Sequence, residues 1–227
     1  MTALAGDQLL DLRHHLGDAA SCVDSTTTAR ALYSTDASIY RIVPLAVAKP
    51  RDTAELLAVL TAAREVGVPV TGRGAGTSCA GNALGAGLVV DMGAHLKSVL
   101  SIDPEARTAV VQPGLVQETL QRAARPYGLR FGPDPSTATR CTIGGMVGNN
   151  ACGPRALGYG TSASNLLDAN VVTGTGEVLR LSAASGSATG RSLLALAESH
   201  RELVEREFGR FGRQVSGYSL EHLLPER

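Results

Sequence analysis

Residues 72–82 read GRGAGTSCAGN, and this glycine-rich stretch decides how the rest of the chain is interpreted. It directly follows residues 68–71, Val-Pro-Val-Thr, which predict a strand. A loop after a strand can present successive backbone N–H groups to an anion, and glycine removes the side chains that would hold a phosphate away. The stretch contains neither G-x-G-x-x-G nor G-K-[ST], so it is no dinucleotide or P-loop fingerprint. A pyrophosphate cradle and an ordinary glycine-rich turn both remain open from these residues alone.

A second glycine-rich stretch covers residues 131–153 and reads FGPDPSTATRCTIGGMVGNNACG. It is too apolar for a solvated linker and carries almost no charge. Its backbone groups, its hydroxyls and the amides of Asn149 and Asn150 suit a large, flat, partly polar ligand enclosed on several sides. The alternative interpretation is a glycine-lined packing contact.

Apolar periodicity around the first stretch predicts a layer of parallel strands and helices. A helix over residues 7–16 is ended by Gly17, and Thr53 caps a second helix that runs to Val66. Strands are expected at residues 45–48, 68–71 and 88–91. A strand, a helix and a strand joined by a short return favour parallel pairing.

The remainder of the chain predicts antiparallel pairs with helices. Strands at residues 98–102 and 108–112 form a hairpin, and Pro113 with Gly114 opens a helix that runs to about Arg125. The other expected elements are a short helix at 145–149, a strand pair at 169–174 and 177–181, a surface loop or hinge at 182–190, a helix at 192–208, and no element in the tail at 217–227. The predicted class is therefore α+β, with a small parallel β/α subdomain and a larger antiparallel sheet with helices.

The composition excludes several classes of function. The chain has 227 residues, with 21 lysines and arginines against 21 aspartates and glutamates, so it offers no basic surface for nucleic acid. Its apolar runs are far shorter than the roughly 20 residues of a transmembrane helix, and its first ten residues lack the basic start of a signal peptide. Four widely separated cysteines without C-x-x-C indicate no metal site. We expect a cytoplasmic protein without metal or nucleic-acid partner.

Several short motifs occur in a fixed order between about residues 34 and 181. They are Pro69-Val70, Gly74-x-Gly76-Thr77, Gln112-Pro113-Gly114, Pro133-Asp134-Pro135-Ser136, Ile143-Gly144-Gly145, Asn149-Asn150-x-x-Gly153 and Tyr159-Gly160. In this order they resemble the FAD-binding domain of the vanillyl-alcohol oxidase type. The resemblance is strongest to the branch of D-lactate dehydrogenase, the glycolate oxidase subunit and D-2-hydroxyglutarate dehydrogenase. The amino-acid sequence of residues 134–136 and 148–153 is similar to that of long family members that also carry a C-terminal iron–sulfur domain.

The resemblance implies a two-subdomain FAD-binding fold and a set of FAD contacts in both stretches. Residues 73–78, Gly81 and Asn82 would hold the pyrophosphate, and residues 133–136 would lie near the flavin ring. The complete implied set is Arg73, Gly74, Ala75, Gly76, Thr77, Ser78, Gly81, Asn82, Pro113, Gly114, Pro133, Asp134, Pro135, Ser136, Ile143, Gly144, Gly145, Asn149, Asn150, Gly153 and Gly160. Thr77 stands where relatives with covalent FAD have a histidine, so non-covalent FAD is expected.

The function implied by the resemblance is that of a flavin oxidoreductase. It would oxidise a D-2-hydroxy acid of the lactate, glycolate or 2-hydroxyglutarate class by hydride transfer to the flavin. The electron acceptor would be a carrier or an iron–sulfur partner. Family members continue beyond this chain with a substrate-capping domain that holds the catalytic histidines and any metal. We therefore expect an N-terminal fragment without catalytic residues of its own, and an iron–sulfur cluster only in the missing C-terminal part.

The resemblance also implies a division of the chain into an N-terminal helical extension at residues 1–35, a first FAD-binding subdomain at 36–95 and an incomplete second one at 96–227. Alternatives stay open for the function. The same FAD domain serves alcohol and sugar oxidases and the UDP-sugar reductase of cell-wall synthesis, whose loops read differently around the second stretch. A module that holds FAD or another nucleotide without turnover is the non-enzymatic alternative.

Overall fold

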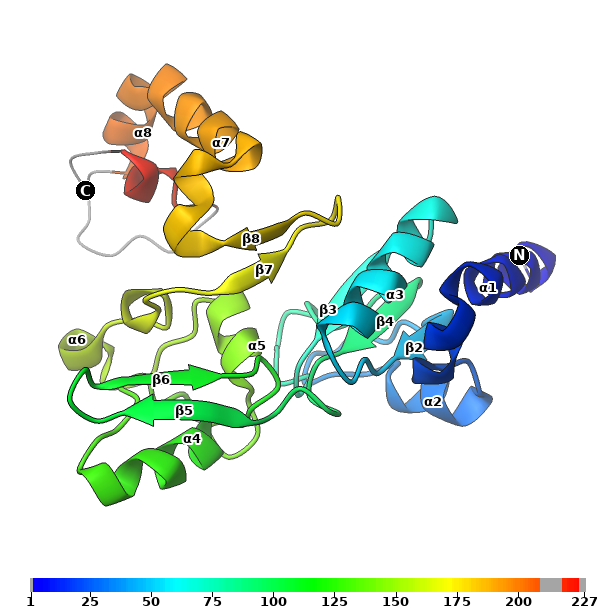
Figure 1. Ribbon diagram of the computed structural model, residues 1–227, viewed down its shortest axis with the longest axis horizontal. Coiled ribbons are helices and arrows are strands. Elements are labelled where there is room, and N and C mark those ends of the chain that lie inside the picture. The colour runs from blue at the N-terminus through cyan, green and yellow to red at the C-terminus, as the bar shows by residue number, and fades with distance from the viewer. Residues whose placement is uncertain (1, 209–217, 225–227) are drawn as a thin grey trace. The chain divides into compact units, whose positions relative to one another are not determined.

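The computed structural model describes residues 2–208 and 218–224 and divides into two compact units, Met1–Leu166 and Leu167–Arg227 (Figure 1). The predicted subdomain boundaries at residues 35 and 95 both fall inside the first unit and stay a prediction. Within the described residues, no helix has the length and apolar character needed to cross a bilayer.

The first unit begins with a four-stranded sheet in the order β1-β2-β4-β3. The strands are β1 (Val23–Asp24), β2 (Ala46–Ala48), β4 (Leu88–Asp91) and β3 (Val70–Arg73). β2 and β3 both run parallel to β4, which confirms the parallel layer, and β1 adds an antiparallel edge that the sequence did not predict. Every residue of β2 and β4 is buried, as expected for central strands of a parallel layer.

Three helices accompany this sheet: α1 (Thr2–Leu16), α2 (Thr27–Leu32) and α3 (Thr53–Glu65), with the 3₁₀ turn η1 (Gly17–Cys22) after α1 (Figure 1). α3 buries Leu56, Val59, Ala62 and Ala63.

The prediction that Thr53 caps α3 is wrong, because Asp52 is the N-cap residue. The carboxylate of Asp52 accepts a hydrogen bond of 2.9 Å from the Glu55 amide. A carboxylate at this position also interacts favourably with the positive end of the helix dipole.

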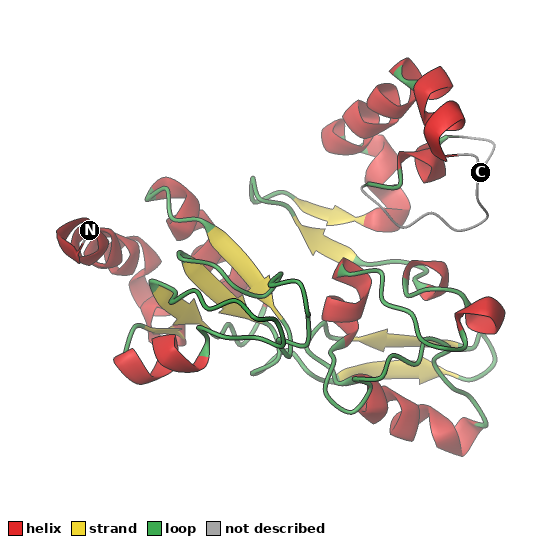
Figure 2. Ribbon diagram, turned by 180° about the vertical axis from the view of Figure 1, so that it is seen from behind, coloured by secondary structure: helices red, strands yellow, loops and turns green. Residues whose placement is uncertain are grey.

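The second half of the first unit is built around the hairpin β5 (Val99–Asp103) and β6 (Thr108–Val111). The helix α4 (Gln117–Ala124) lies along this hairpin and continues into η2 (Arg125–Tyr127) (Figure 2). The remaining elements are α5 (Ile143–Gly148), α6 (Ala156–Tyr159) and η3 (Ala163–Asn165). The core of this half consists of Leu115, Leu120, Cys141, Ile143 and Met146.

The prediction that Pro113 and Gly114 open α4 is wrong, because the helix begins only at Gln117. The carbonyl of Pro113 accepts a 2.7 Å hydrogen bond from the Gly144 amide, and the carbonyl of Leu115 accepts one of 2.9 Å from the Ile143 amide. These bonds to a distant part of the chain hold residues 113–116 outside the helix.

The second unit consists of the hairpin β7 (Asn170–Val172) and β8 (Val178–Arg180), followed by η4 (Leu181–Gly186), α7 (Ala188–Ser199), α8 (Arg201–Phe208) and η5 (Leu220–Leu223). Its core is formed by Ala197, Val204 and Leu224. The α+β class is confirmed, but the described residues form no larger antiparallel sheet: apart from the β1–β2 edge, their antiparallel strands form two separate hairpins.

Three predictions for the second unit are wrong. Residues 182–190 are not a loop, because they contain most of η4 and the start of α7, where the Ser187 hydroxyl accepts a 2.9 Å hydrogen bond from the Gly190 amide. The predicted helix 192–208 is two helices separated at His200. The tail carries η5, while residues 217 and 225–227 of it lie outside the described part.

Candidate functional site

The two glycine-rich stretches meet at a cavity of about 280 Å³ within the first unit. The predicted site residues that line it come from both stretches: Gly74, Ala75, Gly76, Thr77, Ser78, Asn82, Pro135, Gly145 and Asn149. Asn82 and Asn149 join the two stretches directly, since Nδ2 of Asn82 donates a 3.1 Å hydrogen bond to Oδ1 of Asn149. The structure therefore brings together segments that lie 67 residues apart in the sequence.

The loop of residues 74–79, called the glycine loop from here on, follows directly from β3. In the described part of the chain, the backbone N–H groups of residues 75–79 donate no hydrogen bond. All five residues line the cavity. A run of unpaired N–H groups at a cavity is a fitting environment for an anionic group, because backbone donors need partners.

Glycine is needed at two positions of the loop, for a different structural reason at each. Gly76 has a φ of 67°, a left-handed conformation that side chains disfavour. Gly74 is required by close approach, since a Cβ added there would lie 2.1 Å from Oγ1 of Thr142. The loop can therefore reach α5 only with glycine at position 74.

Thr142 fixes the other wall of the cavity. It is buried, and its hydroxyl caps α5 by accepting a 3.4 Å hydrogen bond from the Gly145 amide. Cys141, directly before it, is also buried, and burial raises the pKa of its thiol. This thiol is therefore held in its neutral form, which is a poor nucleophile.

The other predicted site residues do not line the cavity: Arg73, Gly81, Pro113, Gly114, Pro133, Asp134, Ser136, Ile143, Gly144, Asn150, Gly153 and Gly160. Several of these glycines serve close packing within the chain. A Cβ on Gly114 would lie 2.0 Å from the carbonyl oxygen of Met92, and one on Gly144 would lie 2.7 Å from Cβ of Pro113.

Residues 133–160 are held by their own set of interactions. Asp134 forms an ion pair of 3.3 Å with Nε of Arg155, and a Cβ on Gly153 would lie 2.3 Å from the Asp134 carboxylate. The carbonyl of Pro133 accepts a 3.1 Å hydrogen bond from Nε2 of the buried Gln117. These contacts shape the wall behind Pro135, which does line the cavity.

The sequence interpretation missed eight lining residues: Gly72, Cys79, Ala83, Thr137, Cys141, Thr142, Met146 and Ala151. Thr142 carried a usable signal, because a threonine directly before a short apolar helical segment is a typical N-cap. The sequence around Met146 and Cys141 carried no such signal, since apolar side chains are equally typical of the hydrophobic core.

The chemistry of the cavity fits a phosphate-bearing, partly aromatic ligand. Among the described residues that line it, none has a charged side chain. The donors are the backbone N–H groups of the glycine loop, the hydroxyls of Thr77 and Ser78, and the amides of two asparagines. Neutral donors of this kind hold pyrophosphate groups in proteins, and the apolar residues opposite suit a ring. No group of three His, Cys, Asp or Glu side chains that could hold a metal occurs in the described residues.

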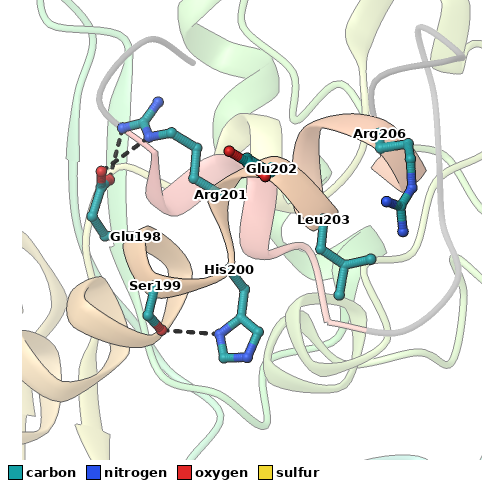
Figure 3. Close-up of a pocket in the computed structure, with 7 residues that line it drawn as sticks. All are labelled: Glu198, Ser199, His200, Arg201, Glu202, Leu203 and Arg206. Carbon is teal, nitrogen blue, oxygen red and sulfur yellow. Dashed lines mark hydrogen bonds and ion pairs between the residues drawn. The ribbon is translucent and has the colours of Figure 1, made fainter.

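A larger depression of about 470 Å³ lies between the end of α7 and the start of α8 in the second unit (Figure 3). Both of its arginines are engaged within the protein, since Arg201 forms a 2.7 Å ion pair with Glu198 and Nε of Arg206 lies 2.9 Å from Oε1 of Glu207. With these cationic donors engaged, the depression is a weaker candidate for an anionic ligand than the cavity at the glycine loop.

Solved structures with a similar fold exist for most of this chain. A structure titled alkyldihydroxyacetonephosphate synthase superimposes with a TM-score of 0.63 at 20% identity, over 70% of this chain and 31% of that one. A BBE-like 1 variant of Physcomitrella patens gives a TM-score of 0.66 at 24% identity, over 74% of this chain and 37% of that one.

Comparison with curated proteins finds relatives at higher identity. The chain is 33% identical over 213 residues to the D-2-hydroxyglutarate dehydrogenase of Pantoea ananatis (strain AJ13355), which is 87% of this chain and 21% of that protein. It is 40% identical over 161 residues to the glycolate oxidase subunit GlcD of Escherichia coli (strain K12), which is 70% of this chain and 32% of that protein. The chain thus spans about a fifth to a third of the length of these relatives. A model of the FAD-binding domain matches residues 44–182, and the chain belongs to this family.

Proposed function

We propose that this chain is the FAD-binding domain of a flavin-dependent oxidoreductase that oxidises D-2-hydroxy acids of the lactate, glycolate or 2-hydroxyglutarate class. The observation that carries the proposal is the run of unpaired backbone N–H groups at residues 75–79, which line the same cavity as residues of α5. The substrate class is supported by the names of the relatives, D-2-hydroxyglutarate dehydrogenase and glycolate oxidase subunit.

The residues of the chain would bind and orient the cofactor. The glycine loop and the hydroxyls of Thr77 and Ser78 would hold the pyrophosphate, while the segment around Pro135 would lie near the flavin ring. The other residues implied by the resemblance, from Pro113 to Gly160, belong to the proposal too: Pro135, Gly145 and Asn149 line the cavity, and the rest would act as support behind it. The bound flavin supplies the redox chemistry as a hydride acceptor, and the protein supplies binding and orientation.

Oxidation of a hydroxy acid also requires a base within about 2.6–3.2 Å of the hydroxyl proton and a cation for the carboxylate. The lining residues in the described part of the chain include no His, Lys, Arg, Asp or Glu. We propose that these groups come from outside this lining, in keeping with a chain that spans about a fifth to a third of its relatives' length. The electron acceptor, an iron–sulfur partner and a cytoplasmic location stay predictions of the sequence.

The test separates cofactor binding from turnover. The purified chain is titrated with FAD, and binding is followed by the change in flavin fluorescence; we expect saturable binding, which Gly76→Val abolishes because of the positive φ at that position. Gly148→Ala is the matched control, because an added Cβ there meets nothing within 4 Å. Circular dichroism establishes that each variant is folded. Absence of FAD binding by the unaltered chain would overturn the proposed function.

Turnover is tested by mixing the FAD-loaded chain anaerobically with D-lactate, glycolate and D-2-hydroxyglutarate. We expect the flavin absorbance to stay unchanged, because the described residues that line the cavity include no base. Bleaching of the 227-residue chain would mean that it carries its own base, contrary to the proposed division of roles.

A further inference from the structure

Arg73 is the last residue of β3 and directly precedes the glycine loop, yet it is not among the residues that line the cavity. Its guanidinium is engaged within the protein. Nη2 donates a 2.9 Å hydrogen bond to the carbonyl of Thr35, and Nη1 donates one of 3.4 Å to the carbonyl of Ala83. Its Cζ atom lies over the ring of Tyr33, 5.1 Å from the centroid, in a cation–π contact.

Tyr33, on which the guanidinium stacks, is fixed to the centre of the sheet. Its hydroxyl donates a 2.5 Å hydrogen bond to Oδ2 of Asp91, the last residue of β4. Asp91 is buried, and its second oxygen accepts a 2.7 Å hydrogen bond from the Gly93 amide. The Asp91 carboxylate thus accepts a hydrogen bond at each oxygen, and it anchors the Tyr33 ring that stacks with Arg73.

Gly76 lies directly on the guanidinium. A Cβ added to Gly76 would lie 2.5 Å from Nη2 and 2.9 Å from Cζ of Arg73. The carbonyl of Gly76 also accepts a 3.0 Å hydrogen bond from the Ala37 amide. The glycine loop thus rests on a floor made by Arg73 and by the chain around residue 37.

We propose that Arg73 is a positioning residue, which holds Gly76 and the unpaired N–H donors of residues 75–79 in place for a pyrophosphate group without contacting the phosphates itself. The inference rests on the proposed function of FAD binding. This positioning role requires a guanidinium, because its planar group can donate hydrogen bonds to two carbonyls while it stacks on an aromatic ring. A lysine ammonium keeps the charge but cannot make this arrangement.

The alternative is that Arg73 binds the phosphates through its charge, and the two roles predict different behaviour. A direct contact contributes to the salt dependence of binding, and lysine retains much of it. If Arg73 only positions the loop, Arg73→Lys and Arg73→Met both lose affinity. The salt dependence of binding in both variants then equals that of the unaltered chain.

The experiment measures the affinities of the 227-residue chain for FAD and ADP by calorimetry at several salt concentrations. The variants are Arg73→Lys and Arg73→Met, with Arg122→Lys, at an exposed position on α4, as the control. We expect both variants at position 73 to lose about tenfold or more in affinity, since two hydrogen bonds and a stacking contact disappear, and the control to lose nothing. Without ligand, hydrogen exchange of the Ala37 amide is expected to accelerate in both variants.

Retention of affinity by Arg73→Lys, with a flatter salt dependence in Arg73→Met, would overturn the proposal in favour of direct contact. Unchanged exchange at Ala37 would overturn it as well. Should the variants fail to fold, nuclear magnetic resonance of the unaltered chain decides: on ADP addition the amides of residues 75–79 shift and the Arg73 guanidinium signals do not, whereas a shifted guanidinium refutes the inference. Absence of FAD and ADP binding by the unaltered chain would instead overturn the proposed function, and this inference with it.

Discussion

Replacing Gly74 by alanine tests the junction of the two glycine-rich stretches. The added Cβ would lie 2.1 Å from Oγ1 of Thr142 and 3.4 Å from its Cβ, and the first distance is far shorter than a van der Waals contact. Either the glycine loop must withdraw or the Thr142 side chain must rotate. Rotation would also break the cap of α5, because the same oxygen accepts the hydrogen bond from the Gly145 amide.

The expected magnitude follows from these two effects. Overpacking of a buried position costs about 1–3 kcal/mol, and loss of a threonine N-cap costs about 1 kcal/mol. We expect Gly74→Ala to lower the free energy of unfolding of the first unit by about 2–4 kcal/mol. In Gly74→Ala/Thr142→Ala the clashing oxygen is absent, and the Cβ of residue 142 lies 3.4 Å from the added Cβ. The double variant should therefore lose only the cap, about 1 kcal/mol, and be more stable than Gly74→Ala alone.

The assay is urea unfolding followed by circular dichroism, together with the FAD affinity of each variant. Gly148→Ala, the exposed control at the end of α5, should stay within about 1 kcal/mol of the unaltered chain. Gly74→Ala should bind FAD more weakly than this control, because the loop that carries the N–H donors has moved. Equal stability of Gly74→Ala and Gly148→Ala would refute the reasoning. A double variant that loses the sum of both single effects would refute it as well.

Further predictions concern titration and cofactor attachment. Burial and then the hydrogen bond to Asp91 raise the pKa of Tyr33, so its contribution to stability is present below the unfolded pKa of about 10 and is lost as the pH rises further. Urea unfolding across this range should show a smaller alkaline loss in Tyr33→Phe, and an identical loss would contradict the prediction. Hydrogen bonds from the Ser182 amide and from Arg180 lower the pKa of Asp168, so its contribution to the second unit is present above about pH 4 and is lost as the pH falls. Hydrogen exchange of the β7–β8 hairpin at acidic pH should depend less on pH in Asp168→Asn, and unchanged dependence would speak against it. Finally, acid precipitation of the FAD-loaded chain should leave the yellow flavin in the supernatant, and colour in the pellet would indicate covalent attachment.

The parallel part of the fold could be predicted because its signals are local. Residues 88–90 are apolar and lie in the buried strand β4, and the apolar spacing in α3 marks the face that it buries. The start of α4 could not be predicted in the same way. Pro113 and Gly114 carry a helix-start signal, but backbone hydrogen bonds to Gly144 and Ile143 override it. Such bonds join residues about 30 positions apart and leave no trace in a local window.

The candidate site was predictable in its residue types and not in its geometry. Glycine at a position indicates that something approaches the backbone closely, but it does not say whether a ligand or another part of the chain does so. A Cβ on Gly114 would meet only atoms of the chain, the Met92 carbonyl first, whereas Gly76 both lines the cavity and lies against the Arg73 guanidinium. The same ambiguity applies to Arg73, which reads as a phosphate-binding cation and in the structure donates to two carbonyls.

Because the described lining of the cavity carries no charged side chain, cofactor affinity should depend mainly on the position of the backbone in the glycine loop. If the donors are main-chain N–H groups, the identity of the side chains at residues 75–79 matters less than the position of the backbone that carries them. That position is set by Thr142 on one side of the glycine loop and by Arg73 on the other. Substitutions at these two residues should therefore reduce cofactor affinity as strongly as substitutions of the loop itself, although Arg73 does not line the cavity. A charged group in the loop would instead let affinity survive small displacements, because electrostatic attraction falls off more slowly with distance than a hydrogen bond does.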